Sequence, residues 1–332
     1  MTLTSSMQAL PSGPTDTELP ITSLSQLPFV DIYLRIDQPE QGRYNPIKKT
    51  IQNSGNLPIP SSLNDDLEVL RQYVLTQPHE DSSYTHDNIR LRIAKKELSD
   101  KSVWASMRRV DPGLLDIDRL NIKPRLLDYL KQCGKRCGLL LIVGATGNGK
   151  TTTAAALVNH YMKAFGGVTF TLEDPVEFLF QGPVGEAGYC FQVHVQDDDG
   201  WAQGLKTALR WHPNYIYVGE IRTPEAAAQM LRAATSGQFV ITTVHGGSIE
   251  EGLAGLLQIA SSAVGNRANA LLADGLIGVL HQTLTPAGPQ IKFLFTEDNN
   301  MGDPIRACVR DGELKLLGTN IAQQNVRMFG HS

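Results

Sequence analysis

The clearest chemical signal in the chain is a phosphate-binding loop. Residues 144–151 read Gly-Ala-Thr-Gly-Asn-Gly-Lys-Thr and fit the pattern G-x-x-x-x-G-K-[ST], between an apolar run and a helical pattern. Glycines let the backbone curl so that its N–H groups point at phosphate oxygens, and the helix N-terminus adds partial positive charge. The side chain of Lys150 is expected to reach the β- and γ-phosphates of ATP, and the hydroxyl of Thr151 to bind Mg²⁺. The predicted nucleotide-binding residues are Gly144, Ala145, Thr146, Gly147, Asn148, Gly149, Lys150, Thr151 and Thr152.

Polar side chains also stand at the ends of three apolar runs. Each run has the length and composition of a strand. Within two positions of the end of a run stand Glu173 (after 168–172), Glu220 (after 215–218) and His245 (after 239–243). Because the carboxyl ends of parallel strands meet at one edge of a sheet, these side chains are expected beside the phosphate loop. Together they predict a site for phosphoryl chemistry.

The spacing of these runs predicts an α/β fold. A first strand-like run at 139–143 leads into the phosphate loop, and helical patterns lie near 201–210, 224–235, 249–260 and 267–282. Strands that alternate with helices predict a mostly parallel sheet that is covered by helices on both faces.

The length of 332 residues exceeds what one ordinary core requires and predicts two domains. Residues 1–25, rich in Ser, Thr, Pro and Gly, are expected to form a disordered tail. Residues 26–110 contain short strand patterns around one helical pattern, which is typical of a small α/β domain. Residues 111–137 are expected to form a connector with one helix, and residues 138–332 the phosphate-loop domain with a helical C-terminal part.

Composition is typical of a globular cytoplasmic protein. The chain is 41% hydrophobic, and no run approaches the length of a membrane span. The N-terminus lacks the pattern of a secretory signal, and the four cysteines lack C-x-x-C spacing, so reduced thiols are expected. The net charge of −4 gives no overall electrostatic reason to bind nucleic acid.

In this order the motifs resemble those of the type II/type IV secretion and pilus ATPase superfamily. The resemblance runs from about residue 90 to residue 327, and PilT-like retraction ATPases and their conjugative and type IVB secretion relatives (DotB/TraJ-like) look most similar. Besides the phosphate loop it rests on an Asp box at 171–178 (TLEDPVEF), an atypical Walker B segment at 208–222 ending VGEIR, a His box at 243–245 (TVH) and a retraction-type motif at 304–311 (PIRACVRD).

The chain departs from the family pattern at three places. Asn148 replaces a more usual Ser, which the loop should tolerate because that position contributes mainly its backbone. Gly246 and Gly247 replace a Thr pair, and no Arg stands in segment 191–194, where the family usually has one. The last difference leaves one phosphate or subunit contact of the family without a counterpart.

The resemblance implies a RecA-like ATPase domain preceded by a small PAS-like domain, in a ring of six copies. The chain would be a Mg-dependent ATPase, a hexameric motor subunit that powers a type IV pilus or a type IV (conjugative or type IVB) secretion machine through interdomain movement. The expected partner is an inner-membrane platform protein, and the expected location is the cytoplasm, peripheral at the inner membrane.

The resemblance also implies roles for the strand-end residues. Glu220 is expected to bind the metal together with Thr151. Glu173 is expected to position or deprotonate the attacking water, although the two glutamates could exchange these roles. His245 would sense the γ-phosphate by hydrogen bonding.

Phosphoryl transfer to water also needs positive charge near the transition state, which a neighbouring subunit often supplies as an arginine. Residues 88–137 carry roughly twice as many basic as acidic residues. Arg92, Arg108 and Arg109 are the candidates for this contact across a subunit boundary. Arg222 is a candidate for a subunit or intradomain contact.

Three other functions remain open on the sequence alone. A small-molecule kinase would need a lid with several arginines, and only Arg222 and Arg232 lie between Glu220 and the next strand. A RecA-like DNA translocase would share the core, and the net charge argues against it without excluding a local basic patch. The intact carboxylates argue against a nucleotide-gated scaffold that performs no chemistry.

Overall fold

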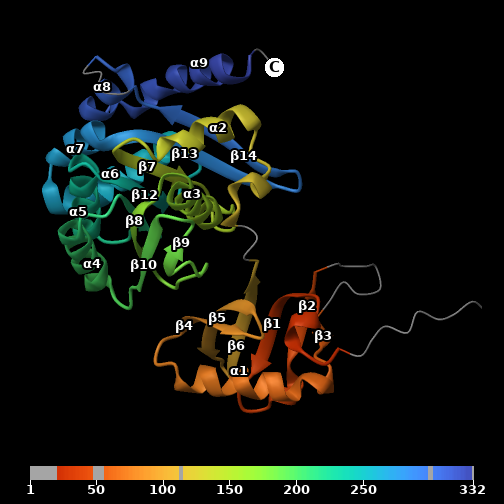
Figure 1. Cartoon of the computed structure of the whole chain (residues 1–332). Helices are drawn as coiled ribbons and strands as arrows, with labels where there is room; N and C mark the ends of the chain where they lie inside the picture. Colours follow the sequence, from red (N-terminus) through yellow and green to blue (C-terminus); the bar gives the residue numbers. More distant parts are fainter. Residues whose placement is uncertain (1–20, 48–55, 112–114, 298–301, 331–332) are drawn as a thin grey trace, which may run out of the picture.

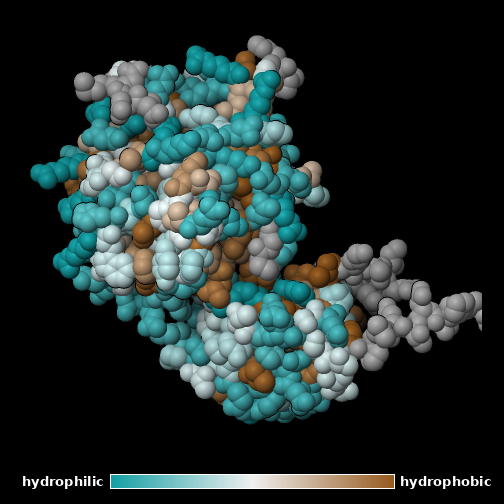
Figure 2. All heavy atoms as spheres, in the orientation of Figure 1, coloured by the Kyte–Doolittle hydropathy of each residue, from teal (hydrophilic) through white to brown (hydrophobic). Residues whose placement is uncertain are grey.

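The computed structural model describes residues 21–47, 56–111, 115–297 and 302–330. They form a smaller N-terminal part and a larger C-terminal part, joined by a connector (Figure 1). Figure 2 shows the two parts as lobes that meet at a waist. Residues 1–20 of the predicted tail and residues 112–114 of the predicted connector lie outside the described residues.

The predicted disordered tail extends too far. Leu24 begins the short 3-10 helix Leu24–Gln26 and is fully buried, as is Leu27. Both side chains belong to the apolar core of the N-terminal part. The prediction of disorder is therefore wrong for residues 21–25, because burial of these leucines outweighs the polar composition around them.

The N-terminal part is an antiparallel sheet with a helix on one face (Figure 1). Its described strands lie in the order β3-β2-β1-β6-β5-β4. Alternating apolar residues such as Ile32 and Leu34 share a core with Leu67 and Leu70 of the helix. The elements are β1 (Phe29–Arg35), β2 (Arg43–Pro46), β3 (Leu57–Pro58), α1 (Asn64–Thr76), β4 (Asp81–His86), β5 (Ile89–Glu97) and β6 (Val103–Val110).

A mostly parallel sheet forms the centre of the C-terminal part. Its described strands lie in the order β14-β13-β7-β12-β11-β8-β10-β9, with the inner strands parallel and the strand at each edge antiparallel. Strand β7 is buried along its whole length, as a strand between two helical layers should be. The strands are β7 (Gly138–Val143), β8 (Gly167–Glu173), β9 (Gly182–Val184), β10 (Gly188–His194), β11 (Tyr215–Val218), β12 (Phe239–Val244), β13 (Leu276–Thr285) and β14 (Gly288–Phe295).

Helices cover both faces of this sheet, as the sequence predicts. Helices α2 and α3 share one apolar core with the sheet, and α4, α5, α6 and α7 share the other. Helix α8 packs on α7, and α9 packs on β14 at the end of the chain (Figure 1). The helices are α2 (Pro124–Cys133), α3 (Lys150–Phe165), α4 (Asp198–Trp211), α5 (Pro224–Thr235), α6 (Ile249–Val264), α7 (Arg267–Gly275), α8 (Pro304–Asp311) and α9 (Leu317–Phe329).

One predicted helix, at 267–282, is partly a strand. Helix α7 ends at Gly275, and β13 begins at Leu276 and pairs in parallel with β7. The run from Leu276 to Leu280 is apolar and fully buried, and periodicity cannot distinguish a buried strand from a buried helix in so short a run. That residues 276–282 form a strand and not a helix matters for the site, because β13 brings the side chain of Gln282 beside the phosphate loop.

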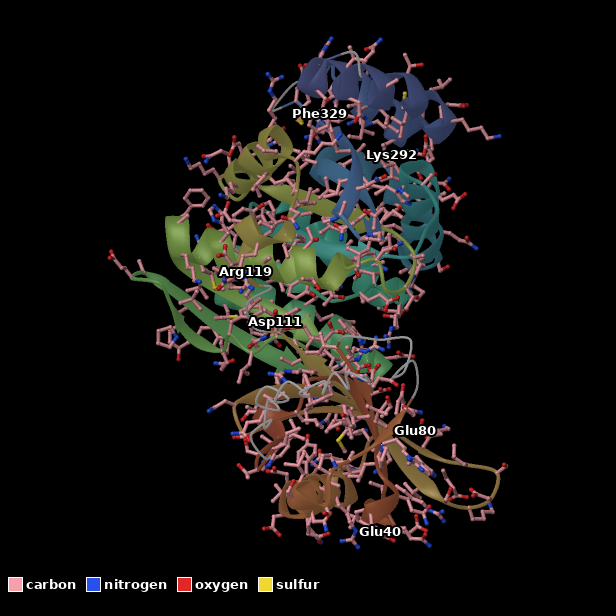
Figure 3. The ribbon with its side chains drawn as sticks, turned by 90° about the vertical axis from the view of Figure 1, so that its right-hand side faces the viewer. Glu40, Glu80, Asp111, Arg119, Lys292 and Phe329 are labelled. Atoms are coloured by element: carbon pink, nitrogen blue, oxygen red, sulfur yellow. The ribbon has the colours of Figure 1, made fainter. Side chains whose placement is uncertain are left out.

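The connector is anchored to the helix that starts at the phosphate loop. Asp111, which follows β6, lies where the two parts meet (Figure 3). The carbonyl oxygen of Leu115 accepts a hydrogen bond of 2.9 Å from Nδ2 of Asn159 in α3. The 3-10 helix Ile117–Leu120 then packs on the same helix before α2 begins.

Candidate functional site

The phosphate loop joins β7 to α3 with a backbone that only glycine adopts easily. Gly147 and Gly149 have φ of 80° and 73°, left-handed conformations that are costly for residues with a Cβ. Gly149 is also the N-cap of α3, so the unpaired N–H groups of the first turn face the loop. Thr151 and Thr152 stand in that turn and are partly exposed. The N–H groups and hydroxyls form a donor set that suits phosphate oxygens.

Lys150 points into the loop. Its side chain is almost buried, and its ammonium donates hydrogen bonds to the carbonyl oxygens of Gly144 (2.9 Å) and Ala145 (3.0 Å). Burial lowers the pKa of Lys150, and the negative charge of Glu220 acts in the opposite direction. Because these carbonyl groups are neutral, the ammonium can exchange them for charged phosphate oxygens, which form stronger hydrogen bonds.

The side chain of Gln282 in β13, which no sequence pattern predicted as part of the site, supports the loop. Gln282 is buried; its Oε1 accepts a hydrogen bond from Oγ1 of Thr153 (2.9 Å), and its Nε2 donates to the carbonyl oxygen of Asn148 (2.7 Å). The side chain of Asn148 also takes part, because its Oδ1 accepts a 3.2 Å hydrogen bond from the N–H of Leu284. The expectation that this position contributes mainly its backbone is therefore incomplete. No sequence motif marks Gln282.

Glu173 ends β8 and is almost completely buried, at 2% exposed. Its Oε1 accepts hydrogen bonds from Oγ1 of Thr171 (2.7 Å) and Nε2 of Gln192 (3.0 Å). Burial raises the pKa of Glu173 to about 7, and the two hydrogen bonds oppose this effect only in part. A carboxylate with a pKa near neutrality is suited to accept a proton from water.

Gln192 orients this carboxylate from the neighbouring strand β10. Its Nε2 also donates to the carbonyl oxygen of Phe178 (3.0 Å), and its Oε1 accepts from the N–H of Phe180 (2.7 Å). The side chain is thus held at both ends. Gln192 was not among the predicted site residues, although its segment lacks the family's Arg, because its partner depends on which strands are neighbours.

Glu220 lies just past β11 in a polar network. Its Oε1 is 3.2 Å from Nε2 of His245, and its Oε2 accepts from Nη2 of Arg222 at 3.2 Å. Arg222 also reaches Oδ2 of Asp174 at 3.3 Å, and Nε2 of His194 lies 3.5 Å from Oδ1 of that carboxylate. Arg222 therefore makes an intradomain contact. These partly exposed pairs add little to stability, so their effect is to orient the groups at the strand ends.

The N-terminal part forms the opposite wall of a cleft of about 570 Å³. Arg92, Arg108 and Arg109 line this wall, in the cleft of their own chain. Nε of Arg108 donates a 2.8 Å hydrogen bond to the buried Asp31, which holds the arginine, and the guanidinium of Arg109 lies over the ring of Phe29. The other predicted site residues on the cleft are Thr146, Gly147, Gly149, Lys150, Thr151, Thr152, Glu173, Glu220 and His245.

The N-terminal sheet also binds the segment that follows β8. Oγ of Ser83 and Nη2 of Arg90 both donate to the carbonyl oxygen of Val176, at 2.8 Å and 2.9 Å. Arg92 forms an ion pair with the carboxylate of Glu177. A shift between the two parts would therefore move the chain directly after the carboxylate at the end of β8.

The cleft fits a nucleoside triphosphate with a divalent cation. A buried ammonium, helix N–H groups and guanidinium groups surround it, and all of them suit phosphate oxygens. Thr151 and Glu220 bring oxygen ligands, which Mg²⁺ prefers in combination with phosphates.

Comparison with known proteins identifies a family and several relatives of this chain. Residues 83–313 match a family model described as "Type II/IV secretion system protein". Competence protein ComGA of Bacillus subtilis (strain 168) is 39% identical over 135 residues, which cover 39% of this chain and 35% of that protein. The type IV pilus retraction ATPase PilT of Pseudomonas aeruginosa is 33% identical over 151 residues, which cover 44% of this chain and 42% of that protein. The chain thus spans less than half the length of these curated relatives.

Two solved structures have the same fold. The pilus retraction motor PilT with bound ADP superposes with a TM-score of 0.68 at 23% identity, covering 89% of this chain and 86% of that one. The Legionella pneumophila ATPase DotB gives 0.70 at 19% identity, covering 91% and 85%. These likenesses confirm the predicted fold class. In the described part of the chain, no helix has the length and apolar character to cross a membrane.

Proposed function

We propose that this chain, which belongs to the family of type II/IV secretion system proteins, is an ATP-hydrolysing subunit of a ring-shaped motor. The main support for the proposal is a single cleft whose two walls carry different chemical groups. One wall holds the phosphate loop and the carboxylates Glu173 and Glu220, and the other holds three arginines of the N-terminal part. This arrangement supplies the charges that phosphoryl transfer to water requires.

In the proposed reaction, a water oxygen forms a bond to the γ-phosphorus while the bond to the β–γ bridging oxygen breaks. Glu173 accepts the proton of the water, and ADP leaves with the bridging oxygen. Lys150 and the loop amides hold the phosphates, and His245 contacts the γ-phosphate. Thr151 and Glu220 would hold Mg²⁺, whose charge offsets that of the phosphate oxygens.

The motor step follows from the contacts between the two parts. The N-terminal sheet holds the segment after Glu173 through Ser83 and Arg90. Loss of the γ-phosphate would change what the arginines on the opposite wall bind, and the N-terminal part would move with them. Such movement is passed to neighbouring copies in the proposed ring of six.

The first test is the ATPase rate per subunit against protein concentration, with mass photometry of the same samples. We expect specific activity to rise as a ring of about six subunits forms. Lys150→Ala and Glu220→Ala should abolish turnover and leave circular dichroism and thermal unfolding unchanged. Wild-type turnover in purified Lys150→Ala protein would refute the site assignment, and full activity of a monomer would refute the ring.

A mixing experiment decides whether the arginines act across a subunit boundary, as the sequence predicts, or in the cleft of their own chain, which they line. A variant with Arg108→Ala and Arg109→Ala should be inactive, as should Lys150→Ala. If the arginines act across the boundary, mixed rings regain activity, because some interfaces then combine an intact loop with intact arginines of the neighbour. If they act in the cleft of their own chain, mixed rings stay inactive.

We further propose that the machine is a type IV pilus or a type IV secretion apparatus, and that the protein works in the cytoplasm at the inner membrane, on a platform protein there. Deletion of the gene should abolish either pilus dynamics or the transfer of DNA or protein. A strain in which Lys150→Ala replaces the wild type should show the same loss. Normal pili and normal transfer in both strains would contradict this assignment.

A further inference from the structure

One buried tyrosine that lines the cleft has no role in the proposed hydrolysis of ATP. Tyr217, in β11, is fully buried and lines the cleft. Its hydroxyl has no hydrogen-bond partner among the described residues. Tyr161, which is equally buried, donates instead to the carbonyl oxygen of Leu130 at 2.8 Å.

Tyr217 is placed to reach Glu173. It pairs in parallel register with Thr171 of β8, whose hydroxyl donates to Oε1 of Glu173. Glu173 is two residues further along β8 and therefore on the same face of the sheet. With a rise of about 3.3 Å per residue and strands about 4.8 Å apart, the two Cα atoms are about 8 Å apart, within the combined reach of the two side chains. Burial raises the pKa of the Tyr217 hydroxyl, and the negative charge of Glu173 acts in the same direction.

The hydroxyl of Tyr217 does not stabilise the fold through a hydrogen bond to any described residue. An unpaired buried hydroxyl is destabilising, and a Phe of the same shape would remove that cost. Oε1 of Glu173 already accepts two hydrogen bonds, while its Oε2 has no donor among the described residues. The unpaired hydroxyl of Tyr217 can donate a hydrogen bond and Oε2 of Glu173 can accept one, so the two groups are complementary.

We propose that Tyr217 is a positioning residue for ATP hydrolysis: its hydroxyl donates a hydrogen bond to the carboxylate of Glu173 during the reaction. The hydrogen bond fixes the carboxylate so that its oxygen faces the attacking water. It also stabilises the charged form that accepts the proton, alongside Thr171, Gln192 and the more distant Arg90, and against the charge of Glu177. The inference rests on the proposed function and adds a residue to it.

The test is Tyr217→Phe in the full-length assembled protein, with Tyr215→Phe as the matched control. Tyr215 lies two residues earlier on the same strand and face, is also buried, and does not line the cleft. Steady-state ATPase rates from pH 5.5 to 9 give kcat and KM, and urea unfolding gives stability.

We expect Tyr217→Phe to lower kcat by about tenfold or more, with KM changed by less than about twofold. The acid limb of its kcat profile should move to higher pH, and its stability should equal or exceed that of the wild type. Tyr215→Phe should keep the wild-type kcat and profile.

A wild-type kcat in Tyr217→Phe would overturn this inference and leave the proposed function standing. Equal losses in Tyr217→Phe and Tyr215→Phe, or a loss that follows weaker folding, would also overturn it, because the role would then be packing. Absence of ATP hydrolysis by the assembled wild type would refute the proposed function and the inference together.

Discussion

Replacing Glu173 by Gln tests whether burial controls the chemistry of this carboxyl group. Burial is the main reason why its pKa is raised from 4.5 to about 7. The folded chain therefore keeps this proton to higher pH than the unfolded chain does. The resulting contribution to stability is complete below about pH 4.5 and is lost as the pH rises through about 7. Gln carries no charge, and its Oε1 can accept the same hydrogen bonds from Thr171 and Gln192.

The size of the effect follows from the same two values. The difference between 4.5 and about 7, at about 1.4 kcal/mol for each pH unit, corresponds to about 3 kcal/mol at pH 8. At pH 5 the same linkage leaves less than about 1 kcal/mol. Glu173→Gln should therefore raise the free energy of unfolding by about 3 kcal/mol at pH 8, and by much less at pH 5.

Urea unfolding at pH 5 and pH 8 measures this difference, with the fluorescence of the buried Trp201 in α4 as the probe. Glu186→Gln is the control, because Glu186 is exposed between β9 and β10 and should show no such pH dependence. The same Glu173→Gln protein should lose ATP turnover, a gain of stability at the expense of function. Burial does not control this carboxyl group if the free energy of unfolding of Glu173→Gln is unchanged at pH 8, or rises equally at both pH values.

Three further predictions test the groups that support the site. Gln192→Leu should lower kcat about tenfold or more with little change in KM, because the carboxylate at the end of β8 loses its orienting donor; an unchanged kcat in steady-state assays would contradict that role. Gln282→Leu should cost about 2–3 kcal/mol in urea unfolding and weaken ATP binding, because the buried hydroxyl of Thr153 and the loop carbonyl lose their partner. Thr283→Val, at the exposed neighbouring position, is its control, and equal effects of the two substitutions would contradict the support of the loop by Gln282. Gly149→Ala should cost about 1–2 kcal/mol by thermal or urea unfolding, because its φ is 73°; a variant as stable as the wild type would contradict this backbone argument.

The sequence by itself determined the phosphate loop and the edge of the sheet on which the carboxylates lie. The loop could be predicted because its chemistry lies within consecutive residues between a strand and a helix. The positions of Glu173 and Glu220 followed from the rule that parallel strands end at one edge. The comparisons confirm the family and the fold class, while the catalytic roles of these residues remain predictions.

Local patterns failed where burial by distant segments decides the outcome. The apolar run at 276–280 became a strand because β7 offered a partner for its backbone. Leu24 is held by a core that forms only when the N-terminal sheet and α1 assemble. The partners that decide the outcome, β7 for this run and α1 for Leu24, are distant in sequence, so periodicity and composition carried no information about them.

Only the tertiary structure decided which side chains support the site. Gln192 and Gln282 reach their partners because β10 lies beside β8 and β13 lies beside β7. The arginines of the N-terminal part face the phosphate loop because the two parts share a cleft. Tyr217 comes within reach of Glu173 because β11 pairs in parallel with β8 and sets Tyr217 opposite Thr171. Hydrogen bonding and burial act through space, and the sequence specifies these contacts only through the packing of the whole fold.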